Sequence, residues 1–169
     1  FLATTSLAGS NATVTIQTEV TNQSVAATVN GSLISTIYDA AGNKVTNVAS
    51  SLSVASGQSL VVTQAVSFAA NLWSLQTPYL YKLVTAVSNQ SAVADIYNTP
   101  FGVRMVTTDA TNGVFLNGQR VAIQGMCNHQ DHGGVGSALP DRLQFYRIER
   151  LMQMGVNGYR SSHNEPTAE

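Results

Sequence analysis

The 169-residue sequence is poor in cysteine, in charge and in long apolar runs. Its single cysteine, Cys127, excludes an internal disulfide framework. Charged residues make up 10% of the chain, against roughly 25% in an average soluble protein, and the net charge is −1. We therefore expect no nucleic-acid partner. Because no stretch approaches the roughly 20 apolar residues of a membrane-spanning helix, we expect no membrane partner either.

Serine, threonine, asparagine, glutamine and alanine take the place of the missing charges. This composition favours an exported protein, so we expect a periplasmic or secreted bacterial protein in preference to a cytoplasmic one. Phe1 begins the chain in mid-pattern, with no initiator methionine and no signal peptide. We therefore expect the chain to be excised from something longer.

Residues 1–100 have no helical period and instead read as β-structure. Apolar and polar residues alternate over 14–20, 60–68 and 81–87, as they do in half-buried strands. A run at 33–38, a hairpin partner at 92–97 and weaker runs at 25–29 and 45–54 bring the count to about seven short strands separated by turn signals. The pattern predicts an all-β immunoglobulin-like sandwich over residues 1–100.

The character of the sequence changes after Thr99-Pro100. Phe101–Val106 predicts a further strand, and 114–121 predicts a hairpin whose turn is Asn117-Gly118, the strongest two-residue hairpin signal. We assign residues 101–118 to a connecting strand and hairpin.

Residues 119–169 predict a βαβ unit. A strand at 121–124 precedes a helix at Asp141–Met154, with Arg147 and Arg150 outside its apolar face, and a second strand follows at Val156–Arg160. Gly155 stands where a helix C-terminal cap belongs. Two parallel strands cannot bury both faces of a sheet, so this segment is expected to begin a larger α/β domain, most simply a (β/α)8 TIM barrel.

Polar, titratable residues follow both predicted parallel strands. His129, Asp131 and His132 come after the first strand, and Arg160 and His163 come at the end of the second. Ligands bind where the carboxyl ends of parallel strands emerge, so these residues predict half of a carbohydrate-type active site.

The same segment contains residues that could serve two other chemistries. The spacing of Cys127, His129, Asp131 and His132 matches no recognised zinc pattern, so we assign them no metal. Cys127 is expected to be a buried small hydrophobe and not a nucleophile, since no sequence signal pairs it with a base.

Three segments, in this order, resemble glycoside hydrolase family 2, the group of β-galactosidases, β-glucuronidases and β-mannosidases. Leu72–Tyr81 is similar to the family's run of Leu-Trp followed by Pro-x-Leu-Tyr, and Phe101-Gly102-Val103-Arg104 to its link into the barrel. The third match is the pair 115–132 and 160–164, which resembles the barrel's first two strands. The resemblance covers essentially the whole chain.

The resemblance implies a retaining exo-β-glycosidase that hydrolyses terminal β-D-galactosides by double displacement. The family's two catalytic glutamates lie on later strands, outside this chain, so the chain alone is expected to be inert. The implied partner is a β-linked galactoside or related glycan. No cofactor is evident, and the resemblance leaves room for a homo-oligomer and for a divalent cation held by residues outside this chain. The alternatives are a β-glucuronidase or β-mannosidase of the same family, or a non-catalytic sandwich module that binds carbohydrate or protein.

The resemblance also implies roles for individual residues. The histidines matching His129 and His163 line the pocket and donate hydrogen bonds to sugar hydroxyls, while the arginine matching Arg160 lies beside the nucleophile and keeps it ionised. Asp131 and Asn164 belong to the same matched segments and are counted as supporting residues.

The sequence departs from the family pattern at two places. Cys127-Asn128 stand where the family often has Asn-Arg, and Glu165 stands in an Asn-Glu-Pro run where the family often has Asn-Pro-Pro. Asn-Glu-Pro resembles an acid/base motif, but it follows the second strand and not the fourth, so Glu165 is expected to be an ordinary loop carboxylate. Trp73, Tyr79 and Tyr81 are assigned to packing and not to sugar stacking.

Overall fold

The computed structural model describes residues 2–25, 27–89 and 92–163, which gather into two units. The sandwich unit consists of Phe1–Thr107 with Leu116–Gln119. The βαβ unit consists of Thr108–Phe115 with Arg120–Glu169. No helix among the described residues is long and apolar enough to cross a membrane.

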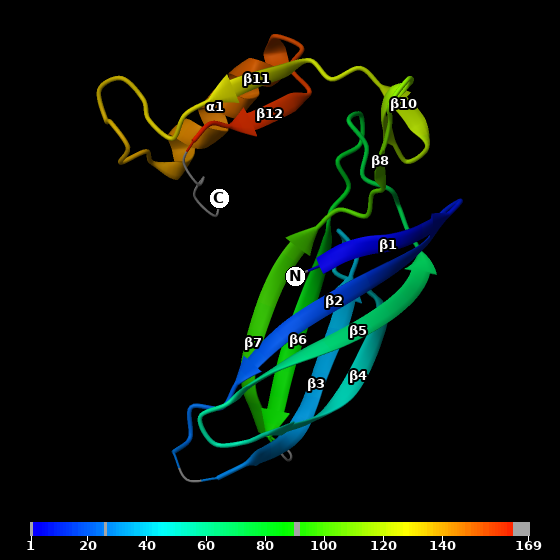
Figure 1. Ribbon diagram of the computed structural model, residues 1–169, viewed down its shortest axis with the longest axis vertical. Helices are drawn as coiled ribbons and strands as arrows, with labels where there is room; N and C mark the ends of the chain where they lie inside the picture. The colour runs from blue at the N-terminus through cyan, green and yellow to red at the C-terminus, as the bar shows by residue number, and fades with distance from the viewer. Residues whose placement is uncertain (1, 26, 90–91, 164–169) are drawn as a thin grey trace. The chain divides into compact units, whose positions relative to one another are not determined.

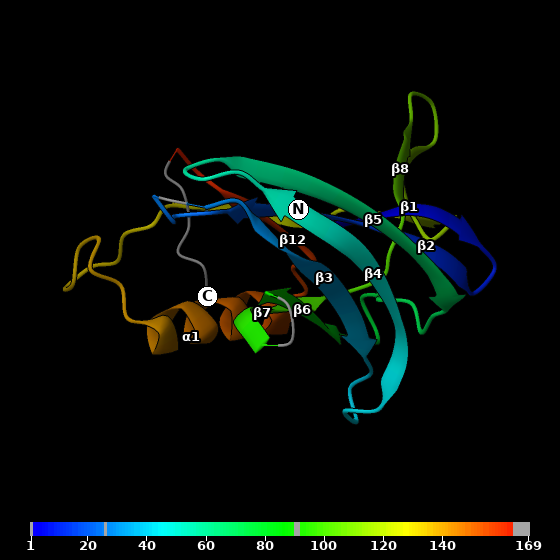
Figure 2. The same cartoon turned by 90° about the horizontal axis from the view of Figure 1, so that it is seen from below.

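The sandwich unit contains two antiparallel sheets (Figures 1 and 2). The three-stranded sheet has the order β1 (Leu2–Ala8), β2 (Asn11–Thr21), β5 (Ser59–Ala69). The four-stranded sheet has the order β4 (Lys44–Val54), β3 (Val29–Tyr38), β6 (Tyr81–Asn89), β7 (Ala92–Phe101). The predicted sandwich is therefore confirmed, and no helix occurs among the described residues before 100.

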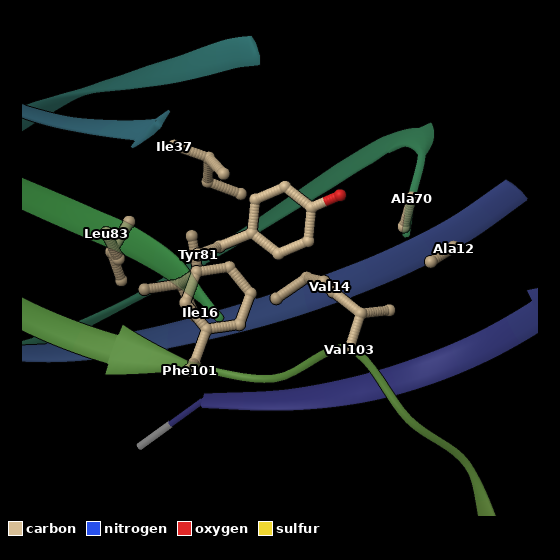
Figure 3. Packing of buried hydrophobic residues seen from close by; sticks show 9 residues of the cluster. All are labelled: Ala12, Val14, Ile16, Ile37, Ala70, Tyr81, Leu83, Phe101 and Val103. Atoms are coloured by element: carbon tan, nitrogen blue, oxygen red, sulfur yellow. The ribbon is translucent and has the colours of Figure 1, made fainter. Parts of the chain in front are cut away.

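The core lies between the sheets, where alternate residues of facing strands meet (Figure 3). Val14 and Ile37 are fully buried, and the Tyr81 ring packs 5.4 Å from Phe68 and 5.7 Å from Phe101, centroid to centroid. The Tyr81 hydroxyl accepts the Asn71 N–H at 2.7 Å, and burial raises the pKa of this phenol. Tyr81 is thus a core residue, as the sequence predicted.

Two details of the predicted strands are wrong. Strand β1 was missed, because its sequence shows no clear alternation. The weak run at 25–29 is not a strand: its described residues before Val29 carry no strand structure, and β3 begins only at Val29.

The predicted single strand over Phe101–Val106 is also wrong. Strand β7 ends at Phe101, and β8 (Val106–Asp109) begins only after an irregular segment. In that segment Val103 C=O accepts the backbone N–H of Trp73 at 2.9 Å, and the Arg104 guanidinium lies 4.5 Å from the Trp73 ring centroid. A Cβ on Gly102 would lie 2.8 Å from Trp73 Cδ1, so the chain bends around the indole instead of continuing the strand.

The hairpin that follows is confirmed. Strands β9 (Gly113–Leu116) and β10 (Gln119–Val121) flank Asn117 and Gly118, whose φ angles of 52° and 79° are those of a type I′ turn. With β8 they form a three-stranded sheet of order β10-β9-β8. Asn117 also donates from Nδ2 to the backbone C=O of Trp73 at 2.9 Å and accepts the Met105 N–H at 2.9 Å, which ties the turn to the backbone at both residues.

The βαβ unit has the predicted order, with shifted strand boundaries. Its elements are β11 (Gly125–Asn128), α1 (Asp141–Gln153) and β12 (Gly158–Ser161), and the two strands pair in parallel. The helix ends close to its predicted limit, with Gly155 at φ 85° donating its N–H to Met152 C=O. The strands at 121–124 and 156–160 were predicted too early.

Asn157 explains the shift. Its side chain accepts the Gln124 N–H at 2.7 Å and donates to Ala122 C=O at 2.9 Å, so it takes backbone groups that a neighbouring strand would otherwise bind. The parallel pairing of β11 with β12 therefore begins at the residues that follow Gln124 and Asn157, where Gly125 pairs with Gly158.

We expect Ile37→Ala to lower the free energy of unfolding by about 2–5 kcal/mol, because it leaves a cavity in a closed core. The matched control is Ile96→Ala in β7, whose side chain is 54% exposed and whose loss should cost about 0.5 kcal/mol or less. Urea unfolding of the chain measures both. Equal losses would contradict the assignment of the core.

We expect Gly102→Ala to cost about 1–3 kcal/mol of stability, because the new methyl group overlaps the indole of Trp73. Trp73 is the only tryptophan, so its fluorescence emission should shift as the ring is displaced. Gly133→Ala is the control, since a Cβ there meets nothing within 4 Å. Emission and stability both unchanged in Gly102→Ala would refute this packing.

Candidate functional site

The carboxyl ends of β11 and β12 bring together the two histidines that the sequence singled out. Asn128 pairs with Ser161 at the last rung of the parallel ladder, and Asn128 C=O accepts one further bond, from the Ser162 N–H at 2.8 Å. Immediately beyond it, the rings of His129 and His163 lie 5.3 Å apart, centroid to centroid, with their planes tilted by 34°. Both side chains are exposed.

His163 has a backbone conformation that is uncommon outside glycine. Its φ is 63°, in the left-handed region that residues other than glycine seldom adopt. The preceding residue, Ser162, is 3% exposed and anchored to β11 by its N–H. The chain therefore turns sharply at His163, directly beside the His129 ring. Strained backbone of this kind clusters at functional sites.

Arg160 in β12 pairs directly with Cys127 in β11, and the two side chains lie on the same side of the ladder. Its Nη1 lies 3.9 Å from Cys127 Sγ and 3.4 Å from Ser162 Oγ. No carboxylate is among its contacts within the described part of the chain, so its charge is available to an anionic group. The prediction that Cys127 is buried is wrong: the thiol is free and exposed, at one edge of a two-stranded sheet.

Asp131 and His132 lie in the loop between β11 and α1. The Asp131 side chain is exposed, while its backbone C=O accepts a bond from Arg147 Nη2 at 2.6 Å. His132 closes a tight turn with Gly136 through bonds in both directions, and its Nδ1 lies 2.8 Å from Gly133 C=O. The structure thus brings His129, His163 and Arg160 to one edge, whereas the His132 ring contacts its own turn.

Arg147 is a functional candidate that the sequence analysis did not single out. The helical pattern put it outside the apolar face, yet its side chain is half-buried and bonds to the loop that carries His129. The sequence did not predict these hydrogen bonds to the loop. Arg150 does lie exposed, with Nη1 2.8 Å from Gln153 Oε1.

The remaining sequence candidates, Asn164 and Glu165, lie outside the described residues. Within the described ranges, no three His, Cys, Asp or Glu side chains come together as a metal site.

The sandwich unit contains a cleft of about 780 Å³, which the sequence did not predict. It is bordered by the later residues of β2, beyond those that pair with β1. Glu19, Asp95 and Tyr97 are among its lining residues, and none of the predicted site residues is.

The βαβ unit exposes much of its apolar surface. No residue of α1 is buried, and Phe145, Met152 and Tyr159 are 60%, 65% and 42% exposed. Parallel strands are normally covered on both faces, so these surfaces have the composition of a core that further elements would complete.

Residues 1–104 match the sequence model of glycosyl hydrolases family 2. A β-galactosidase of Bacteroides ovatus is 36% identical over the whole chain, and a β-glucuronidase of Formosa agariphila is 30% identical over 90% of it. The chain spans 20% and 16% of the length of these two curated relatives.

The fold is also similar to that of solved members of the family. A glycosyl hydrolase family 2 member from Bacteroides cellulosilyticus superposes with a TM-score of 0.92 at 30% identity, over 99% of this chain and 22% of that one.

Proposed function

Because the chain belongs to family 2 of the glycosyl hydrolases, we propose that it is part of a longer retaining exo-β-glycosidase. In this proposal residues 1–100 are the immunoglobulin-like domain, 101–118 the connecting strand and hairpin, and 119–169 the first βαβ unit of the catalytic (β/α)8 barrel. The exposed apolar faces of α1, β11 and β12 support the barrel, because further strands and helices would cover them.

One observation carries the assignment of the site: two histidines from different strands stand ring beside ring at the carboxyl ends of a parallel pair. In a (β/α)8 barrel that end is where substrates bind. We assign His129 and His163 to the pocket for the terminal sugar, where imidazole N–H groups donate to its hydroxyls. Asp131 and Asn164 are assigned supporting roles at the same edge.

Arg160 is assigned the place beside the nucleophile. Retaining glycosidases use one carboxylate to attack the anomeric carbon and a second to protonate the leaving oxygen and then to activate water. A guanidinium near the first carboxylate keeps it ionised and oriented. The exposed Arg160 side chain, with no carboxylate among its described contacts, suits this role. Both catalytic carboxylates are assigned to parts of the protein outside this chain.

We propose terminal β-D-galactosides as the substrate. The match of the Bacteroides ovatus β-galactosidase over the whole chain supports them. β-Glucuronides are the second candidate, supported by the match of the Formosa agariphila β-glucuronidase over 90% of the chain.

Chromogenic β-galactoside, β-glucuronide and β-mannoside distinguish these substrates when assayed with the longer protein and with the 169-residue chain. We expect β-galactoside turnover by the longer protein and none by the chain. Turnover by the chain alone would overturn the placement of both carboxylates outside it. A strict β-glucuronide preference would replace the galactoside proposal.

We expect His129→Ala and His163→Ala to lower turnover of the longer protein by about ten- to a thousandfold, at about 1.4 kcal/mol per decade, because each removes a hydrogen bond that strengthens in the transition state. Arg160→Ala should be at least as damaging. Glu165→Gln is the control and should be nearly neutral. Loss of activity in Glu165→Gln, with His163→Ala active, would contradict the assignment.

A further inference from the structure

We propose that Arg147 is a positioning residue, which holds the loop carrying His129 and Asp131 in the shape that the site requires; this inference rests on the function proposed above. Arg147 lies on α1, and its guanidinium contacts the loop backbone and not the substrate edge itself. It would act through His129, the residue that it holds.

The geometry is that of a two-pronged clamp. Nη1 donates to His129 C=O at 3.1 Å and Nη2 donates to Asp131 C=O at 2.6 Å, so one planar group fixes both sides of Gln130. The rigid fork of a guanidinium suits two acceptors at a fixed separation. A lysine ammonium is a single point donor and cannot reproduce this arrangement.

A second contact from the same helix reaches the residue between the prongs. Gln144, three positions before Arg147 and therefore on the same helical face, donates from Nε2 to Gln130 Oε1 at 3.1 Å. The Gln130 Nε2 atom is buried with no hydrogen-bond partner in the described part of the chain. Each of the three loop residues 129–131 is thus bound to α1, and Arg147 supplies two of the three bonds.

The loop needs an external anchor because its own sequence does little to order it. Gly133, Gly134 and Gly136 follow within a few residues, and the last two have φ angles of 94° and 60°. Glycines lose more conformational freedom on ordering than other residues. Because a displacement of about 1 Å at a reacting site can cost about a hundredfold in rate, a clamp on the His129 backbone matters to turnover even though it touches no substrate.

The test compares Arg147→Met and Arg147→Lys with Arg150→Met in the longer glycosidase. Arg150 is the matched control: it lies on the same helix, and its contacts are the Gln153 side chain and the Tyr146 ring, 4.9 Å away. We expect kcat to fall about a hundredfold in Arg147→Met and about tenfold in Arg147→Lys, which keeps one prong. Arg150→Met should stay within about twofold. Equal effects of Arg147→Met and Arg150→Met would overturn the inference.

A double-mutant cycle with His129→Ala separates positioning from general stability. If Arg147 acts through His129, its replacement should cost no more than about threefold once His129 is alanine, because residues that act as a unit are not additive. The same fold loss in both backgrounds would mean a merely structural role and would overturn the inference. If Arg147→Met does not fold, Arg147→Lys serves in the cycle.

The same cycle distinguishes a failure of this inference from a failure of the proposed sugar site. A neutral His129→Ala overturns the proposed site and the inference together. A damaging His129→Ala beside a neutral Arg147→Met overturns the inference alone.

Discussion

The His129 and His163 rings lie side by side because of the register in which strands β11 and β12 pair, and Asn157 sets that register. Its amide binds the backbone of both Ala122 and Gln124 before the ladder begins, so that Gly125 and Gly158 face each other at the first rung. A slip of one residue would turn every side chain of one strand to the opposite face. Cys127 would then no longer face Arg160, and the two imidazole rings would separate.

The residues that carry the family resemblance in the sandwich unit have structural tasks. Trp73 occupies the space left by the missing side chain of Gly102, Arg104 lies over its ring, and Asn117 binds its carbonyl group. These contacts join the end of the sandwich to the following hairpin. The contacts consist of side-chain packing and backbone hydrogen bonds. They explain why Trp73 and Gly102 stand at these positions without invoking sugar binding.

Much of the fold could be predicted because period-2 alternation depends only on which face of a strand is buried. β5 and β6 follow this rule, whereas β1 does not and was missed. The strand before the site was placed too early because residues 121–124 are apolar enough for a strand. The Gln124 N–H and the Ala122 C=O bind the Asn157 side chain instead of a strand, and no local pattern reveals a partner more than thirty positions away.

The candidate site was partly predictable for a similar reason. The βαβ order alone predicts that His129 and His163 share an edge, since the carboxyl ends of parallel strands coincide. Arg147 could not be found in this way. A helical wheel assigns a charged residue to solvent, and only the path of the loop brings the carbonyl groups of His129 and Asp131 within reach of its guanidinium.

Strand β7 is one of the two outer strands of the four-stranded sheet, and it carries exposed Val93, Ile96 and Tyr97. An apolar edge of this kind invites pairing with another molecule and, from there, aggregation. Asp95 counters this in two ways: it puts a carboxylate in the middle of the strand, and its Oδ1 accepts the Ile96 N–H at 2.8 Å. Near the end of the strand Pro100 has no N–H to donate. Asp95 and Pro100 are thus residues of the kinds that protect an exposed strand edge from pairing with another chain.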